Sequence, residues 1–162
     1  MDAIELLEKQ HREVESFFRE LKLLDPAEPK SRQAIFEMLA DALAVHAQIE
    51  ERIFYPAAKS KRTTGILHHS VEEHLGQKRL LARLMELQPS DPHFLDLLEQ
   101  LEREVSHHVR EEETQLLPYA RLQLGRVKLE ELGAQMERLT TELEQHEPRE
   151  AVPGETDHPA PI

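Results

Sequence analysis

The chain has 162 residues, a size that fits one domain. Its 39% hydrophobic residues are accompanied by only 4% aromatic residues, five glycines and no tryptophan, which disfavours a β-sandwich or β-barrel and favours helices. The net charge of −12 disfavours nucleic-acid binding, because an acidic surface repels phosphate groups. The absence of cysteine excludes disulfides, thiolate catalysis and cysteine-ligated metal centres.

Neither a secretory leader nor a membrane-spanning segment is recognisable. The first residues lack a basic region followed by an apolar stretch, and no apolar run reaches the ~18 residues that a bilayer requires. We therefore expect a cytoplasmic protein that makes no contact with membranes.

Five helices are expected in chain order, because apolar residues recur at helical spacing between proline-rich or polar breaks. Ser31 is suited to cap the second helix, after a break at residues 25–29, and a polar connector at residues 59–65 follows it. Asp91 and Pro92 form an N-cap and first-position pair for the fourth helix. The expected helices cover residues 2–24, 31–58, 67–87, 91–124 and 127–146.

The first four helices are long and joined by short connections, which predicts an all-α, up-down-up-down four-helix bundle over residues 2–124. The fifth helix is expected to lie across the bundle or to mediate self-association. Residues 147–162 hold four prolines and a glycine among few apolar residues, which predicts a disordered tail after a single domain of residues 1–146. The apolar stripe of the fifth helix consists of Leu132, Met136, Leu139 and Leu143.

An internal duplication is the most informative feature of the sequence. The segment HAQIEERIFYPAA at residues 46–58 aligns with HVREEETQLLPYA at residues 108–120, and His, Glu, Glu, Pro and Ala recur at the same offsets. A further histidine precedes each segment, since His11 lies 35 residues before His46 and His74 lies 34 residues before His108. The chain is therefore interpreted as two similar helical hairpins related by a pseudo-twofold axis.

Helical periodicity places six polar residues of this repeat on apolar stripes. His11, for example, lies four residues after Leu7 and three before Val14. A single inward histidine is usually a hydrogen-bonded core residue, but burying a carboxylate without a partner is costly. Because six such residues converge by repeat symmetry, we interpret them as metal ligands. These six residues are His11, His46, Glu50, His74, His108 and Glu112.

The other histidines and the second glutamate of each repeat serve as a comparison. Glu51 and Glu113 lie one residue off the inward line and are expected to be solvated or to support a ligand rather than to bind metal. The prolines at positions 56 and 118 are expected to bend their helices. His107 is expected to point to solvent, and surface or connector positions are expected for His68, His69, His93, His146 and His158.

Imidazole and carboxylate ligands without thiolate suit iron, manganese or zinc. Six ligands are too many for one tetrahedral zinc ion but divide between two ions, with one histidine pair for each ion and two bridging carboxylates. Both ions would keep open positions for water, hydroxide, dioxygen or peroxide. The residues therefore predict a redox-capable dinuclear site. The pairs are His11 with His46 and His74 with His108, and the bridges are Glu50 and Glu112.

This ordered set of residues, with its repeated proline, resembles the hemerythrin-like HHE cation-binding domain over residues 4–124. The resemblance implies a four-helix bundle with a non-haem di-iron centre, oxo- or hydroxo-bridged, in which the six residues are the ligands. Oxygen-carrying hemerythrins have a second histidine where Lys78 stands and end on His-x-x-x-x-Asp, whereas Glu112 lies four residues after His108. This departure disfavours reversible oxygen carriage.

The sequence is more similar to bacterial HHE proteins and to the iron-sensing domain of a eukaryotic ubiquitin-ligase subunit. That similarity implies binding or sensing of dioxygen, peroxide, nitric oxide or iron, in oxidative or nitrosative stress. Zinc or manganese remain alternative ions. No catalytic motif accompanies the site, and enzymatic activity stays open.

Two alternatives also stay open. A ferritin-like oxidase or ferroxidase would use Glu-x-x-His strings, and Glu8 with His11 and Glu104 with His107 form two of them. A non-catalytic interaction module would present the fifth helix to a second copy or to another protein.

Overall fold

The computed structural model describes residues 1–162 and contains helices without strands. Two of the long helices each contain one π-helical turn, η1 and η2, and continue beyond it as α-helix. A final 3₁₀-helix, η3, follows the last α-helix. The elements are α1 Ala3–Leu23, α2 Pro29–Ile49, η1 Glu50–Phe54, α3 Tyr55–Ala58, α4 Thr64–Met85, α5 Pro92–Glu111, η2 Glu112–Leu116, α6 Leu117–Glu144 and η3 Pro148–Glu155.

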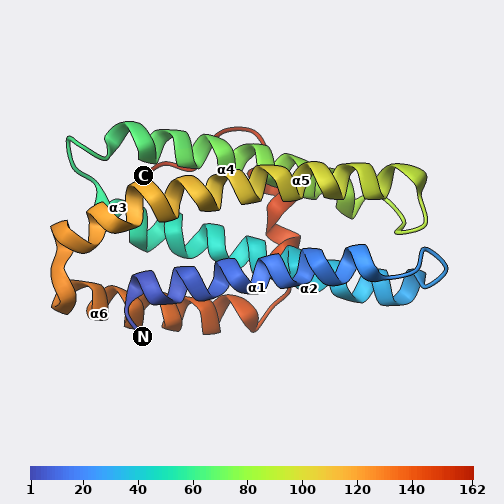
Figure 1. The fold of residues 1–162 in the computed structure, drawn as a ribbon, viewed down its shortest axis with the longest axis horizontal. Helices are drawn as coiled ribbons and strands as arrows, with labels where there is room; N and C mark the ends of the chain where they lie inside the picture. Colours follow the sequence, from blue (N-terminus) through green and yellow to red (C-terminus); the bar gives the residue numbers. More distant parts are fainter.

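The long helices form the predicted up-down-up-down bundle (Figure 1). α1 packs against α2, and α4 packs against α5, so each half of the bundle is a helical hairpin. Asp2 caps α1 by accepting a hydrogen bond from the Glu5 amide at 2.9 Å. Asp91 caps α5 in the same way through the His93 amide at 2.8 Å. The all-α fold class is thus confirmed, and no helix is long and apolar enough to cross a membrane.

The second helix begins earlier than the sequence predicted. It starts at Pro29 rather than after Ser31, and Glu28 at its N-cap makes no capping hydrogen bond. Proline suits the first turn of a helix, because its missing N–H would lack a helical acceptor there and its φ angle is already helical. Proline geometry therefore determines this helix start in place of a serine cap.

The fifth predicted helix is the second part of α6. Gly125 breaks α6 with φ 75° and ψ 167°, a backbone conformation that favours glycine. After this break the helix returns along α1 and α2 (Figure 1). Leu132, Met136 and Leu139 are buried there, and Leu143 packs beside them. The stripe is therefore covered within the chain, and the expectation that it mediates self-association is not supported.

The predicted disorder of residues 147–162 is wrong. Residues Pro148–Glu155 form η3, which packs against α2 and α4. Val152 is buried, and Arg149 contacts Asp41 with a distance of 2.9 Å between Nη1 and Oδ2. Prolines restrict the backbone of an unfolded chain and so reduce the entropy lost on ordering. A few long-range contacts are then enough to fix a segment that its composition alone suggests is disordered.

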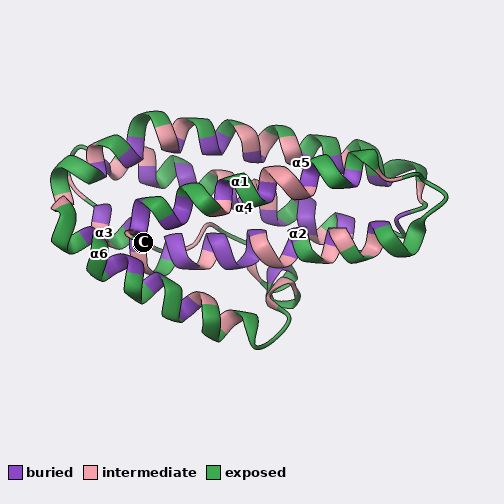
Figure 2. Ribbon diagram, turned by 60° about the horizontal axis from the view of Figure 1, so that its bottom comes forward, coloured by how far each residue is buried: buried purple, intermediate pink, exposed green.

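The apolar core is divided into two halves along the bundle. One half contains Leu7, Ile49 and Val71, and the other contains Val14, Leu43 and Val105. Buried positions follow the inner faces of the helices along the whole bundle (Figure 2). Along each bundle helix, the inward histidine lies between residues of one core half and residues of the other. A polar layer therefore separates the two apolar regions.

Candidate metal centre

The four inward histidines come together as two pairs, one in each hairpin. The ring centroids of His11 and His46 are 4.8 Å apart, and those of His74 and His108 are 4.7 Å apart. Both pairs have an interplanar angle of 65°. This matching geometry follows from the internal repeat. All six predicted site residues are at most 7% exposed: His11, His46, Glu50, His74, His108 and Glu112.

Glu50 lies between the two histidine pairs. Its Oε1 is 3.1 Å from His46 Nε2, and its Oε2 is 3.0 Å from His74 Nε2. Potential ligand atoms of His11, His46 and Glu50 lie within 4.8 Å of one another, and the same is true of Glu50, His74 and His108. Glu112 is closer to one pair, with its Oε2 2.8 Å from His108 Nε2. One buried carboxylate is therefore shared by two groups of three donors.

Each inward histidine is held from outside by a side-chain acceptor. A hydrogen bond from Nδ1–H to such an acceptor fixes the orientation of the ring, so that Nε2 is the atom that faces inward. Two of the acceptors, Glu51 and Glu113, lie on the opposite hairpin and are equivalent in the repeat. The four Nδ1–Oε1 distances are 2.8 Å for His11 with Glu113, 2.8 Å for His74 with Glu51, 2.8 Å for His46 with Gln10 and 3.0 Å for His108 with Glu73.

Sequence reasoning missed Gln10 and Glu73. The available signal was their place in the repeat, since each directly precedes the first histidine of its hairpin. Both face the histidine of the neighbouring helix in the same hairpin. Their equivalence shows that the pseudo-twofold relation extends to the residues around the six predicted ligands.

Tyr55 is a further residue that the sequence did not reveal. Its side chain is fully buried, and its hydroxyl donates to Glu50 Oε2 at 3.0 Å or to Glu112 Oε2 at 3.2 Å. The ring stacks on His74 with a centroid distance of 5.6 Å. Burial, together with the charges of Glu112 and Glu50, raises the pKa of Tyr55 well above 10. The phenol therefore stays protonated and acts as a donor between the two carboxylates.

The π-helical turns explain why Tyr55 was missed. Its amide donates to the carbonyl of Glu50, five residues earlier, instead of to the carbonyl four residues earlier. This wider turn brings residue i+5 onto the inward face, whereas ordinary helical spacing points it away. Pro56 follows directly, so the predicted bend takes the form of a π-turn. The second repeat has the same turn before Pro118 but carries Leu117 in place of the tyrosine.

Lys78 occupies the position at which oxygen-carrying hemerythrins have another histidine. It is buried, and its Nζ lies 3.0 Å from both carboxylate oxygens of Glu51. A further contact of 3.2 Å joins it to Glu155 in the C-terminal segment. Lys78 therefore holds the acceptor of His74 and is not directed to the histidine pairs.

The electrostatic environment differs between the two hairpins. Burial, and then the neighbouring His46, lower the pKa of His11 to about 2. Burial also disfavours the charged form of His108, but its hydrogen bond to Glu112 and the charge of that carboxylate raise the pKa well above 6.5. Burial and the nearby Glu50 raise the pKa of Glu112 to about 7. Burial alone would raise the pKa of Glu50, yet His46 and the surrounding hydrogen bonds lower it.

The donor set fits a metal centre. Four buried side-chain atoms in this layer make no hydrogen bond: His11 Nε2, His46 Nε2, Glu50 Oε1 and Glu112 Oε1. Each unsatisfied buried polar atom costs about 1–3 kcal/mol, and here all of them are atoms that bind iron, zinc or manganese. His46 Nε2 and Glu50 Oε1 are 3.1 Å apart but lack hydrogen-bond alignment. A group of buried donor atoms without hydrogen bonds is expected where bound cations compensate the cost of burying them.

The ferritin-like arrangement does not form in this structure. Glu8 is exposed, and the side chain of His107 is 57% exposed, so the two Glu-x-x-His strings do not meet inside the bundle. The surface positions expected for the remaining histidines are found at His68, His69, His93, His146 and His158.

Comparisons with known proteins agree with the helical fold and with a cation-binding domain. A relative named DNA nickase, from Nostoc sp., is 28% identical over 145 residues, which are 90% of this chain but only 41% of that protein. A crystal structure of a hemerythrin HHE cation binding domain-containing protein from Mycobacterium kansasii has a TM-score of 0.76 and 24% identity, covering 94% of this chain and 97% of that one. The family pattern of the hemerythrin HHE cation binding domain matches residues 2–120. This chain belongs to the hemerythrin HHE cation-binding domain family.

Proposed function

We propose that the buried layer holds two iron ions. His11 and His46 would bind one ion, His74 and His108 the other, and Glu50 with Glu112 would bridge them. The observation that carries this proposal is the position of Glu50, whose two oxygens face different histidine pairs. Its support includes the unsatisfied buried donor atoms and membership of a cation-binding family.

A bound iron pair would supply redox chemistry toward dioxygen, peroxide or nitric oxide. The surrounding residues orient the donors for that role: the four Nδ1 hydrogen bonds fix the imidazole rings, and Tyr55 positions the two bridging carboxylates. The two apolar halves of the core limit access of bulk water to this layer.

We further propose that the protein binds or senses one of these small molecules, or iron itself, in an oxidative or nitrosative stress response. Reversible oxygen carriage is disfavoured because Lys78 holds Glu51 instead of offering a fifth imidazole. A DNA-cleaving role is not proposed, because the chain covers only 41% of the relative with that name and carries a net charge of −12.

The test is the metal content of protein expressed with added iron, measured by plasma mass spectrometry beside an absorption spectrum. We expect about two irons per chain, as in other paired-metal sites. His46→Ala and His108→Ala should each lose most of the iron, whereas His68→Ala, a change at an exposed histidine, should retain it.

Wild-type iron content in both His46→Ala and His108→Ala would overturn the proposal. Loss of iron in Glu104→Ala with retention in His46→Ala would instead support the ferritin-like alternative. A single zinc ion per chain, with no iron, would also contradict an iron pair.

A further inference from the structure

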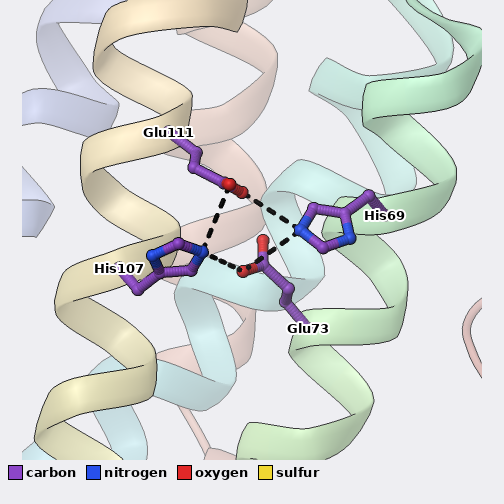
Figure 3. Close-up of side chains that lie close together, drawn as sticks. All are labelled: His69, Glu73, His107 and Glu111. Atoms are coloured by element: carbon purple, nitrogen blue, oxygen red, sulfur yellow. Dashed lines mark ion pairs between the residues drawn. The ribbon is translucent and has the colours of Figure 1, made fainter.

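A second group of metal-binding side chains lies on the outer face of α4 and α5 (Figure 3). We call it the surface cluster. It contains one His-x-x-x-Glu pair on each helix, and the four side chains converge between the two helices. The cluster consists of His69, Glu73, His107 and Glu111.

We propose that the surface cluster is a binding site for one divalent transition-metal ion of the zinc type, separate from the buried centre. This inference does not depend on the identity of the ions in the buried layer. Its evidence is the spacing, the chemistry and the position of the four side chains.

The spacing matches a tetrahedral ion. Ligands placed 2.0–2.1 Å from zinc at tetrahedral corners are separated by about 3.3–3.4 Å. In the surface cluster, His69 Nε2 is 3.1 Å from a Glu111 oxygen and 3.5 Å from a Glu73 oxygen. His107 Nε2 is 3.2 Å from Glu111 and 3.7 Å from Glu73. Small side-chain adjustments are therefore enough to place all four donors around one ion.

The chemistry of the four donors also suits such an ion. Two imidazoles and two carboxylates are typical ligands of zinc and related divalent metals. Each pair is spaced four residues apart on its helix, which places both side chains on one face. The imidazole side chains of His69 and His107 are 54% and 57% exposed, so an ion reaches them directly from solvent.

The internal repeat provides an independent comparison. The positions equivalent to the surface cluster in the first hairpin are Leu6, Gln10, Val45 and Ile49. Three of these are apolar and buried in the core half that α6 completes. The same face of the second hairpin has no such cover and carries two histidines and two glutamates. The two halves of the repeat therefore use this face differently, one for helix packing and one for polar side chains that converge.

One carboxylate connects the surface cluster to the buried centre. Glu73 Oε1 accepts a hydrogen bond from His108 Nδ1 at 3.0 Å, while its Oε2 faces His69 and His107. A change at Glu73 would therefore disturb both sites. His69 and Glu111 make no hydrogen bond to the six buried residues, so they are the positions at which to test the surface cluster alone.

The experiment is a titration of the full-length, iron-loaded protein with Zn²⁺, followed by equilibrium dialysis with metal analysis. We expect one additional zinc ion per chain at micromolar concentration. Loss of an outer hydrogen-bond partner already costs 10- to 100-fold in metal affinity, so His69→Ala and Glu111→Gln should each weaken binding by at least about tenfold. The matched controls His68→Ala and Glu99→Gln change exposed residues of α4 and α5 outside the surface cluster and should bind like the wild type.

Two further results decide the proposal. In a His46→Ala background, which removes a buried donor, adding His69→Ala/Glu111→Gln should still remove one bound zinc ion per chain, because the surface cluster is formed by α4 and α5 alone. Unchanged zinc binding in the double variant His69→Ala/Glu111→Gln would overturn the site. Binding weaker than millimolar in the wild type would overturn it as well, and the cluster would then be a set of surface ion pairs.

Discussion

At the level of single side chains, His11 and His108, one from each histidine pair, differ in protonation before a metal ion binds. His11 has a pKa of about 2, because burial and the nearby His46 disfavour its charged form. It therefore presents a free lone pair at neutral pH. His108 is buried to a similar degree, but its hydrogen bond to Glu112 raises its pKa well above 6.5. A metal ion must displace a proton from this ring before it binds.

The first prediction concerns those protons. We expect metal binding to the metal-free protein at pH 7 to release about one proton or more, mainly from His108 and Glu112. Because both pKa values are raised, the proton competes with the metal, and the apparent affinity should fall as the pH is lowered. Calorimetric titrations in two buffers of different ionisation enthalpy measure the release.

Variants distinguish the two pairs in the same experiment. Expressed per metal ion bound, the proton release should be smaller in His108→Ala than in His11→Ala, because His108 is one of the groups that lose a proton and His11 is already neutral. Equal release in both variants, or no release from the wild type at pH 7, would contradict the electrostatic difference between the hairpins.

The sequence could predict the convergence of six residues, because ordinary helical spacing holds up to Glu50 and Glu112. It could not predict Tyr55, since the π-turn that follows Glu50 changes which residue faces inward. The hydrogen bonds from Lys78 to Glu51 were also hidden, because they join helices 27 residues apart in sequence. Periodicity describes one regular helix at a time, so it misses local irregularities and contacts between helices.

Among the helices, the packing of α6 on α1 depends on a close approach at Gly133. A Cβ atom at this position would overlap the backbone of residues Met1–Ala3, and backbone atoms at the start of α1 cannot move aside as a flexible side chain can. Gly65, near the start of α4, has open space around it. The two glycines therefore provide a matched pair for testing how the last helix is docked.

We expect Gly133→Ala to destabilise the protein by about 1–3 kcal/mol, the usual cost of overpacking a tight contact. Gly65→Ala should be neutral or stabilise by up to about 1 kcal/mol, because alanine favours the helix. Urea unfolding of both variants measures the difference. If Gly133→Ala is as stable as Gly65→Ala, α6 is not held against α1 by this contact.

At the scale of the helices, sequence reasoning predicted five helical segments and their order, with differences of a few residues at their ends. It failed for the C-terminal segment, where composition indicated disorder. The contacts of Arg149 with Asp41 and of Glu155 with Lys78 join residues more than 70 positions apart, and Val152 is buried among residues of other helices. Such contacts leave no local pattern, so the amino-acid composition of the segment cannot reveal them.

Across the whole molecule, the C-terminal segment lies against one side of the buried layer. Glu155 lies 3.2 Å from Lys78, which in turn holds Glu51, the acceptor of the His74 hydrogen bond. The Gln48 amide also donates to Glu155. A chain of polar contacts therefore runs from the segment to one of the proposed ligands. The segment is expected to stabilise the fold and to slow the loss of metal.

Removal of residues 147–162 tests this role. We expect the melting temperature to fall by several degrees, because burial of a valine side chain contributes about 1.5–3 kcal/mol and each kcal/mol corresponds to about 2–4 °C in a chain of this size. Iron should also pass to an external chelator faster than from the full-length protein, since Glu51 and Lys78 become more accessible. Differential scanning calorimetry and the absorbance of the chelate measure the two effects.

A point variant separates the polar contact from the loss of the whole segment. Glu155→Gln keeps the segment but removes its negative charge beside Lys78, so chelation should accelerate with little change in melting temperature. Glu150→Gln, at a side chain that is 63% exposed, should match the wild type in both measurements. If Glu155→Gln and the truncated protein both lose iron at the wild-type rate, the segment covers the bundle without influencing the metal centre. Comparison of the chelation rates of the wild type, Glu155→Gln and the truncated protein therefore tells what controls chelator access to the metal centre from this side. It distinguishes the charge of Glu155, the covering of the bundle by the segment, and neither of the two.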